Sequence, residues 1–330
     1  MNIDFLPRVR LAQLPTPVDE LGRLSQALGG PRILVKRDDQ TGLATGGNKT
    51  RKLEFLVADA LAQGADVLVT AGAAQSNHCR QTAAAAARTG LGCVLVLGGD
   101  PPETPNGNLL LDRLLGAELH WSGEHRKGED LEAVAEELRQ VGRKPYVVPY
   151  GGSNALGAVG YALAMRELAR HTPGGGSLDD IDHIVFASSS GGTQAGLMVG
   201  ARLVGYTGQI VGIDIDKRAA DAMDYRDQLA QLANDTVALL EQHAKFVPDD
   251  FDVVADYTGG GYGVVGDLER EAIDLTARIE GLLLDPVYTG RAMGGLIDMV
   301  RRGVFQSGET VLFWHTGGTP ALFSYADALV

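Results

Sequence analysis

The residue types best suited to chemistry gather in the segment Thr45–Glu54, which reads Thr-Gly-Gly-Asn-Lys-Thr-Arg-Lys-Leu-Glu. After its two glycines, apolar residues recur at the spacing of one helical face: Leu53, Leu56, Val57, Ala60 and Leu61. Lys49, Arg51 and Lys52 fall in the first turn of this predicted helix, although a helix N-terminus already carries about half a positive charge. This placement favours a bound anion, or a lysine that its neighbours keep neutral and that acts as a nucleophile. A solvated basic helix start is the alternative.

A second segment, Ser188–Gly196, follows the predicted strand Ile184–Ala187 and consists mainly of small residues. Small residues let the backbone turn tightly, and the N–H groups of the next helix can then hold a phosphate. The segment is neither a Walker loop nor the three-glycine dinucleotide fingerprint, which weighs against a nicotinamide-dependent dehydrogenase. Together with the lysine-bearing helix it indicates pyridoxal phosphate, which needs a lysine, a phosphate cup and a partner for its ring nitrogen. Two segments offer candidates for that partner, Asp285–Gly290 and His315–Pro320, and in the second Thr316 stands at the carboxyl end of a predicted strand.

Short apolar strands alternate with helices along the chain, a pattern that predicts parallel sheets covered on both faces. The predicted strands are Arg32–Lys36, Asp66–Thr70, Cys93–Leu97, Glu118–Trp121, Tyr146–Val148, Ile184–Ala187, Ile210–Ile213 and Val311–His315. Loops rich in Gly, Ser, Thr or Asn follow strands near residues 46, 75, 152 and 190. Because ligands bind at the carboxyl ends of parallel strands, we expect these four loops to surround one site.

The composition excludes several function classes. The chain has 330 residues, 45% of them hydrophobic and 22% charged, as in ordinary globular proteins of one or two domains. A formal charge of −13 argues against nucleic acid or an anionic membrane as partner. The sequence has no run of about twenty apolar residues and no signal-peptide pattern at its N-terminus. With only Cys79 and Cys93, a reducing cytoplasm is the expected location.

Six segments together resemble the 1-aminocyclopropane-1-carboxylate deaminase and D-cysteine desulfhydrase family of pyridoxal-phosphate enzymes. They are Lys36–Asp39, Gly46–Glu54, Gln75–His78, Gly259–Gly263, Asp285–Gly290 and His315–Gly318. The resemblance extends from about residue 5 to the end of the chain. It implies the tryptophan-synthase-β-like fold, fold type II: two open parallel-sheet α/β domains with the cofactor between them. The expected large cofactor-binding domain comprises residues 1–51 and 161–330, and the small α/β domain residues 52–160.

The resemblance also implies roles for individual residues. Lys49 is expected to bond covalently to pyridoxal 5′-phosphate, with Lys52 near the phosphate. The remaining cofactor contacts are expected from Asn77 at the phenolic oxygen, from the phosphate turn Ser190, Gly191, Gly192 and Thr193, and from Thr316 at the pyridine nitrogen. Substrate contacts are expected from Gln75, Ser76, Asn77 and Thr289. The residues expected to take part in catalysis are Lys49, Ser76, Tyr262 and Tyr288.

Two positions favour one reaction within the family. Members that open the cyclopropane ring carry glutamate at the position of Thr289 and leucine at that of Thr316, whereas this chain resembles D-cysteine desulfhydrase at both. A hydroxyl leaves the pyridine nitrogen neutral, which suffices for elimination of a good leaving group. The sequence therefore predicts β-elimination on a small amino acid, D-cysteine first, by a homodimer. The alternatives are L-cysteate sulfo-lyase, then 1-aminocyclopropane-1-carboxylate deaminase, and a catalytically silent binding protein.

Other polar residues have structural interpretations. His78 is as readily a satisfied helix histidine as a catalytic one, Cys79 is expected to be a small buried thiol, and His315 is expected to be structural. Asp38 and Asp39 are expected to brace their loop, because no further carboxylate or histidine stands at metal-ligand spacing. Residues 217–245 are expected to form a solvated helical face, and 173–177 and 101–105 surface loops.

Overall fold

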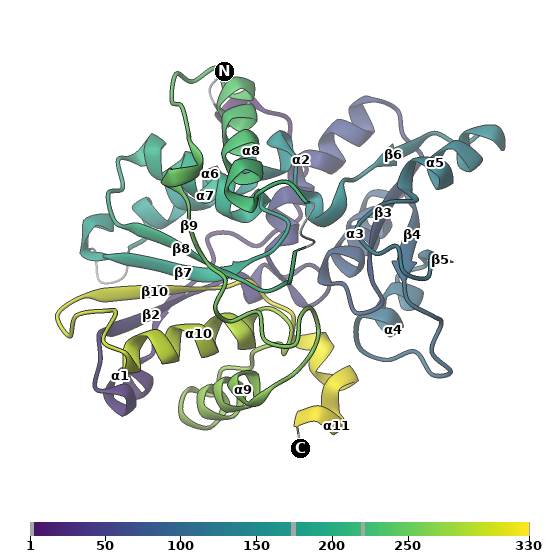
Figure 1. Ribbon diagram of the computed structural model, residues 1–330. Helices are drawn as coiled ribbons and strands as arrows, with labels where there is room; N and C mark the ends of the chain where they lie inside the picture. The colour runs from purple at the N-terminus through teal and green to yellow at the C-terminus, as the bar shows by residue number, and fades with distance from the viewer. Residues whose placement is uncertain (1–2, 173–175, 219–221, 330) are drawn as a thin grey trace.

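The computed structural model describes residues 3–172, 176–218 and 222–329, in which helices flank two separate sheets (Figure 1). Residues 173–175 of the expected loop lie outside the described residues. All the predicted strands are present, each within a residue or a few of the expected bounds. The predicted alternation of strands and helices is thus confirmed.

The larger sheet has six strands in the order β1-β2-β10-β7-β8-β9. Their bounds are β1 Val18–Glu20, β2 Arg32–Arg37, β10 Thr310–His315, β7 His183–Ser188, β8 Gln209–Asp214 and β9 Asp252–Val254. Every pairing is parallel except that of β1 with β2. The edge strands β1 and β9, which the sequence pattern did not predict, are three residues long and largely exposed or half-buried, so they have no apolar run.

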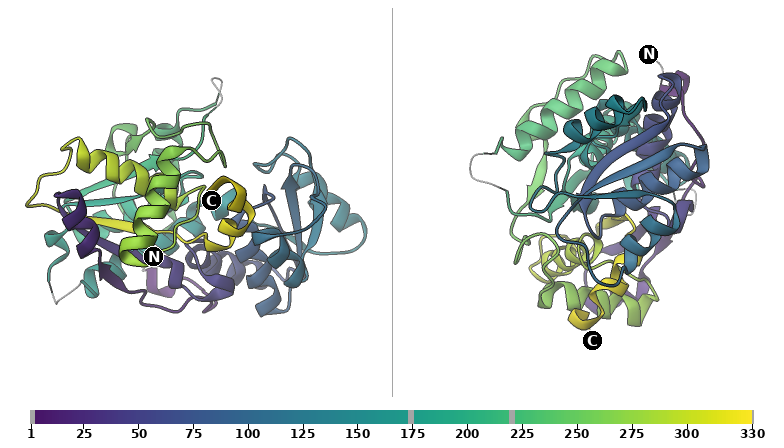
Figure 2. Two further views of the ribbon diagram at one scale, coloured as in Figure 1. Left: turned by 90° about the horizontal axis from the view of Figure 1, so that it is seen from below. Right: turned by 90° about the vertical axis from the view of Figure 1, so that its right-hand side faces the viewer.

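The four-stranded sheet has the order β5-β4-β3-β6, all parallel. Its strands are β5 Glu118–Trp121, β4 Gly92–Gly98, β3 Val67–Ala73 and β6 Pro145–Val147. Figure 2 shows this smaller sheet to one side of the larger body, with the C-terminal segment at the junction. All strands of the smaller sheet come from residues 67–147, within the range expected for the small domain.

The described helices of eight or more residues are α2 Lys49–Ala62, α3 Asn77–Thr89, α4 Gly107–Leu114, α5 Leu131–Gln140, α6 Ala155–Arg170, α7 Gly192–Val204, α8 Tyr225–Leu239, α9 Asp267–Glu280 and α10 Thr289–Arg301. Shorter ones are α1 Gly22–Leu28 and α11 Ala326–Leu329. Alternate strand residues face opposite sides of a sheet. Accordingly Val311 and Phe313 pack against α10 on one face, while Leu312 and Trp314 pack against α6 and α7 on the other. The larger sheet is therefore a buried layer between helices.

The expected solvated face over residues 217–245 is one side of α8, where Arg226, Asp227, Gln231 and Asp235 are exposed, but the sequence did not predict the buried side. Tyr225, Leu229, Ala233 and Val237 are buried in a core cluster that also includes residues of α6 and α7. These residues recur every fourth position, and the alanines and polar residues between them dilute the apolar signal in the sequence. Residues 219–221 are outside the described part of the chain.

Helices α2 and α6 pack closely where the chain passes between the two sheets. A Cβ on Gly160 would lie 2.5 Å from the carbonyl oxygen of Arg51, so only glycine allows this approach. The expected domain boundaries, after residues 51 and 160, fall inside these two helices. The boundaries themselves stay a prediction.

Asp38 braces the segment before α2, as expected, because it accepts hydrogen bonds from Arg51 Nε and Nη2, both at 2.8 Å. Tyr161 donates to the same carboxylate at 2.7 Å, and Glu167 accepts from Arg51 and from Lys36. Arg51 is fully enclosed, so its charge is balanced by protein carboxylates and not by a ligand. The interpretation of Arg51 as part of an anion site is therefore wrong.

We expect Asp38→Asn to lower the free energy of unfolding by about 3 kcal/mol, because it leaves the buried Arg51 guanidinium short of one partner. Burial alone would raise the pKa of Asp38, but Arg51 and Lys36 hold it at about 2. The contribution should thus be complete above pH about 4, the range of an unfolded aspartate, and disappear as pH falls through 2. Urea unfolding at several pH values measures this. Asp39→Asn, whose pair with Arg37 is partly exposed, should cost about 1 kcal/mol or less.

Candidate active site

The backbone before Lys49 adopts conformations that few residues tolerate. Ala44 and Thr45 have positive φ of 42° and 70°, and Gly46 and Gly47 have φ of 71° and 129°. A Cβ on Gly46 would overlap the carbonyl of Asp39. Such strained backbone is held only where the surroundings fix it, and it concentrates at functional sites. The strain places Lys49 at the first position of α2.

Partners from distant segments hold this turn. The Thr41 hydroxyl accepts from Gly47 N at 2.8 Å, and Gln81 Oε1 on α3 accepts from Thr50 N at 2.8 Å. Asn48 N donates to the carbonyl of Thr316 at 3.0 Å, which ties the start of α2 to the end of β10. The segments after β2 and β10 of the larger sheet therefore meet helix α3, which follows β3 of the smaller sheet.

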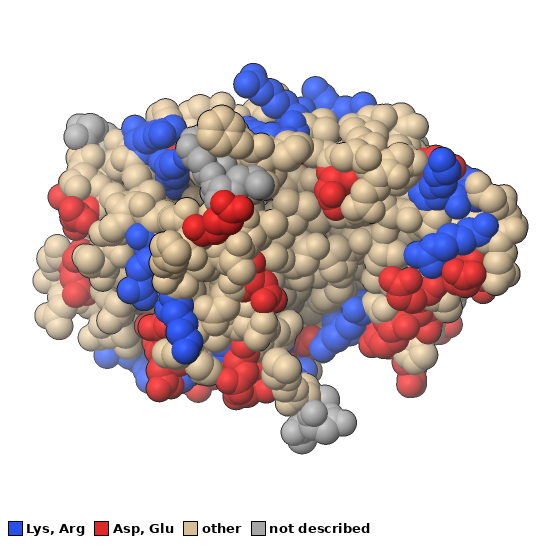
Figure 3. Space-filling model, turned by 90° about the horizontal axis from the view of Figure 1, so that it is seen from above, with Lys and Arg blue, Asp and Glu red and all other residues tan. Residues whose placement is uncertain are grey.

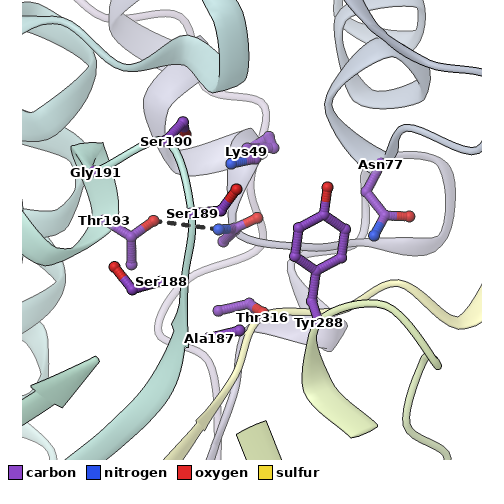
Figure 4. A pocket seen from close by; sticks show the side chains of 11 residues that line it. Lys49, Asn77, Ala187, Ser188, Ser189, Ser190, Gly191, Thr193, Tyr288 and Thr316 are labelled. Atoms are coloured by element: carbon purple, nitrogen blue, oxygen red, sulfur yellow. Dashed lines mark hydrogen bonds between the residues drawn. The ribbon is translucent and has the colours of Figure 1, made fainter. Parts of the chain in front are cut away.

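A pocket lies at this meeting point (Figure 4). Its lining comes from the starts of α2, α3, α7 and α10 and from the ends of β7 and β10. The lining residues are Asn48, Lys49, Asn77, Ala187, Ser188, Ser189, Ser190, Gly191, Thr193, Tyr288 and Thr316. Of the four loops expected to surround one site, those near residues 46, 75 and 190 contribute residues to this pocket. The loop near residue 152 does not line it.

Lys49 and Lys52 lie next to each other in the first turn of α2, and Lys49 lines the pocket. Lys49 keeps some surface in the cavity, while the deep position of its amine lowers its pKa to about 8. Burial, then the charge of Lys49, lower the pKa of Lys52 well below its usual range. Lys52 Nζ donates to Gly151 O at 3.1 Å and to Ser153 Oγ at 3.2 Å. The hydrogen-bond acceptors of the Lys52 amine are thus uncharged oxygens. Among the described residues, no carboxylate lies within ion-pair distance of Lys49 or Lys52.

The turn into α7 forms a cradle above Lys52. Gly192 begins the helix, and a Cβ there would lie 2.9 Å from Lys52 Nζ and 2.7 Å from Ser153 Oγ. Ser153 Oγ accepts from Gly192 N at 3.1 Å and lies 2.8 Å from Ser190 Oγ. Ser153 was not among the expected site residues, although its Gly-Gly-Ser loop was one of the four loops expected there. Across the cradle, Asn48 donates to Thr193 Oγ1 at 3.2 Å (Figure 4).

Tyr288 and Tyr262 form a hydroxyl pair on the opposite wall, with 2.6 Å between their oxygens. Tyr288 lines the pocket, and Tyr262 supports it from behind. Burial raises the pKa of both phenols well above the usual range, so both hydroxyls keep their protons and one donates to the other. The Arg126 guanidinium stacks on the Tyr262 ring at 4.3 Å and pairs with Asp216 at 2.8 Å. This contact joins the loop after β5 to the loop after β8.

Three expected substrate residues do not line the pocket. Thr289 is fully buried and its hydroxyl exchanges hydrogen bonds with Asp285, donating to Oδ1 at 2.7 Å. Gln75 directs its amide to Asn106 O and Asn108 N. Ser76 caps α3 by accepting from Cys79 N at 3.2 Å. Substrate contacts by these side chains stay predictions, and for Thr289 the local bonds to Asp285 argue against one.

The remaining polar residues have structural partners. His315 Nε2 lies 2.9 Å from Leu283 O, and its Nδ1 accepts from Gly317 N, so both ring nitrogens have protein partners and the side chain is structural, as expected. His78 Nε2 pairs with Thr70 Oγ1 at 2.8 Å, while its Nδ1 has no partner and its pKa is lowered by burial. Cys79 is a fully buried thiol, as expected. Within the described residues, no group of three or more His, Cys, Asp and Glu side chains is arranged to hold a metal ion.

These residues fit pyridoxal phosphate. Two adjacent buried lysines with no carboxylate partner favour a bound anion. The absence of a Cβ at Gly192 leaves room for a phosphate beside Lys52. Lys49 faces the same cavity from the start of α2, and Thr316 and Asn77 provide a hydroxyl and an amide at its other walls. The donor set thus matches a phosphorylated aldehyde that bonds to a lysine amine.

Comparison with known proteins agrees. The family "Pyridoxal-phosphate dependent enzyme" matches residues 9–317. The chain is 44% identical to D-cysteine desulfhydrase from Klebsiella pneumoniae (strain 342), with 98% of each chain covered. A crystal structure of an ACC deaminase homologue superposes with a TM-score of 0.89 at 39% identity, covering 99% of this chain and 96% of that one. O-ureido-L-serine synthase, at 18% identity and TM-score 0.65 over 97% and 92%, shares the fold. These matches confirm the predicted fold.

Proposed function

This chain belongs to the pyridoxal-phosphate-dependent enzymes, and on that premise we propose that it converts D-cysteine to pyruvate, hydrogen sulfide and ammonia. The family confirms the predicted cofactor and the prediction of an enzyme. The similarity to D-cysteine desulfhydrase along the full chain supports the choice of substrate. The observation that carries the proposal is a lysine amine with a pKa of about 8 that shares one pocket with the neutral phenol of Tyr288.

The chain provides a binding residue for each part of the cofactor. Lys49 would form the covalent bond, and Lys52, Ser190 and the backbone from Gly191 to Thr193 would hold the phosphate. Asn77 would donate to the phenolic oxygen and Thr316 would face the pyridine nitrogen. When bound, pyridoxal phosphate withdraws electrons from the Cα of an amino acid, which makes its proton acidic.

Lys49 and Tyr288 then divide the proton transfers. The Lys49 amine, which burial keeps close to half-neutral near pH 8, removes the Cα proton of the substrate. The Tyr288 hydroxyl, which burial keeps protonated, donates to the departing sulfur as the Cβ–S bond breaks. Tyr262 orients that hydroxyl through the 2.6 Å contact. One water then replaces the nitrogen, giving pyruvate and ammonia beside hydrogen sulfide.

The wider assignments follow the family resemblance. We infer a homodimer in the cytoplasm, acting on a small amino acid. On the face drawn in Figure 3, acidic and basic side chains are interspersed among uncharged areas, which offers no broad basic surface for nucleic acid. In the described part of the chain, no helix is both long and apolar enough to cross a bilayer.

We expect purified protein to release pyruvate and sulfide from D-cysteine, and far less from L-cysteine, L-cysteate or 1-aminocyclopropane-1-carboxylate. A keto-acid assay run on the four compounds in parallel, with sulfide and sulfite measured separately, tests this. Pyruvate with sulfite from L-cysteate would assign the sulfo-lyase reaction, and 2-oxobutyrate from the cyclopropane compound would assign ring opening. A colourless protein that takes up no pyridoxal phosphate would favour the silent binding protein.

A further inference from the structure

Asn108, the second residue of α4, is fully buried and has no part in the proton transfers, yet it connects several segments of the site. Its Nδ2 donates to Gln75 O at 3.0 Å and to Asn77 Oδ1 at 2.9 Å. Its Oδ1 accepts from Arg80 Nη1 at 3.1 Å. The side chain therefore has a donor end at the pocket wall and an acceptor end behind it.

Arg80 fixes which end faces which way. An asparagine amide has nearly the same shape in its two orientations, so its partners decide the orientation. A guanidinium can only donate, and Arg80 is fully buried, so the end of Asn108 that faces it must be Oδ1. The Asn108 Nδ2 then faces the Asn77 side chain. Because Nδ2 donates, the Asn77 atom nearest to it must be the oxygen Oδ1. Only the Asn77 N–H groups remain for the pocket.

The position of Arg80 is itself fixed. Its Nη2 donates to the carbonyl of Gly46 at 2.7 Å, in the strained turn that precedes Lys49. Burial lowers its pKa to about 10, so the guanidinium stays charged at neutral pH. Figure 4 shows the result at the pocket: the Asn77 nitrogen is turned toward the cavity and its oxygen away from it.

We propose that Asn108 is a positioning residue which, oriented by Arg80, makes Asn77 present an N–H and never its oxygen to the phenolic oxygen of the cofactor. This rests on the proposed function only in that pyridoxal phosphate occupies the pocket. A donor there stabilises the ionised phenolic oxygen, whereas an amide oxygen would repel it. The relay Arg80–Asn108–Asn77 thus sets the charge state of the bound cofactor from behind the pocket wall.

Asn108→Asp tests the orientation with almost no change in shape. The new carboxylate accepts from Arg80 but cannot donate, so Asn77 must rotate to donate to it and then turns its oxygen to the cofactor. We expect the pH midpoint of the cofactor's visible absorbance to shift by about one unit or more. We also expect cofactor affinity to fall about tenfold, as for loss of a hydrogen bond to a charged group. Both are measured without substrate.

Asn106→Asp is the matched control, because it makes the same change two residues away. Asn106 caps Gly107 with its oxygen, which aspartate retains, and donates outward to Phe323 O. The absorbance spectrum, the pH midpoint of that absorbance and the cofactor affinity of Asn106→Asp should match those of the wild type. Asn77→Asp, which offers only carboxylate oxygens to the cofactor, should show the shift by itself.

An unchanged midpoint and affinity in folded Asn108→Asp would overturn the proposal, as would an equal shift in Asn106→Asp. If Asn108→Asp fails to fold, Asn108→Ala replaces it: the freed Asn77 amide should shift the midpoint in the same direction but less, and no shift would again overturn the proposal. A wild type that binds the cofactor but leaves D-cysteine intact would refute the proposed substrate alone, because the absorbance measurements would still test the relay.

Discussion

Lys49→Ala is expected to abolish the visible absorbance of the protein-bound cofactor and to reduce pyruvate formation from D-cysteine by at least about 10³-fold. The reduction combines two losses. The covalent attachment disappears, and with it the base that removes the Cα proton, a contribution of about 10²–10⁴-fold for a positioned general base. Absorbance spectra recorded after unbound pyridoxal phosphate is removed, and steady-state rates measured with excess pyridoxal phosphate, test the expectation.

Lys52→Ala is the matched comparison, since Lys52 lies one helical turn along α2 from Lys49. Its amine faces the Gly192 cradle and not the cavity, so the variant should stay yellow while binding the cofactor more weakly. Circular dichroism establishes that both variants are folded. If Lys52→Ala were the colourless, inactive protein and Lys49→Ala stayed yellow and active, the assignment of the two lysines would be reversed.

Tyr288→Phe is expected to lower kcat for D-cysteine by about 10²-fold with little change in KM, because it removes the proton donor at the leaving sulfur. Tyr262→Phe, which removes a hydroxyl behind the pocket wall, should lower kcat by about tenfold or less. Sequence motifs alone did not choose between these tyrosines. Their positions favour Tyr288, because it lines the pocket and Tyr262 does not.

A substrate with a better leaving group separates proton donation from a merely structural effect. Chloride leaves without protonation, so β-chloro-D-alanine should be turned over almost as fast by Tyr288→Phe as by the wild type. An equal loss of kcat on both substrates would mean that Tyr288 shapes the pocket and does not donate the proton. A larger loss in Tyr262→Phe than in Tyr288→Phe would exchange their roles.

The sequence predicted the architecture well because the interior strands are buried on both faces and are continuous apolar runs, as in Val311–Phe313 and Ile184–Phe186. It also predicted that the loops near residues 46, 75 and 190 meet: the first and last follow parallel strands of the larger sheet, and the loop after β3 of the smaller sheet faces them. The short exposed strands β1 and β9 carry no such run, so no pattern marked them.

Side-chain partners were predicted less well, because spacing along the chain does not reveal contacts from distant segments. Arg51 stands between two site lysines in the sequence, yet it turns to Asp38 and Glu167. Thr289 exchanges hydrogen bonds with Asp285, four residues before it, a contact that its expected role did not include. Ser153, in the loop expected near residue 152, and Asn108, at the start of α4, were not among the expected site residues, because their partners come from distant segments.

Reductive trapping tests the central claim, that Lys49 holds the cofactor, most directly. Borohydride reduction of the cofactor-loaded protein makes the lysine bond permanent, and trypsin does not cleave after a modified lysine. The expected modified peptide spans Asp38–Arg51, with the adduct on Lys49 and no cleavage after it. An adduct in the peptide Lys52–Arg80, on Lys52, or in any other peptide would contradict the account.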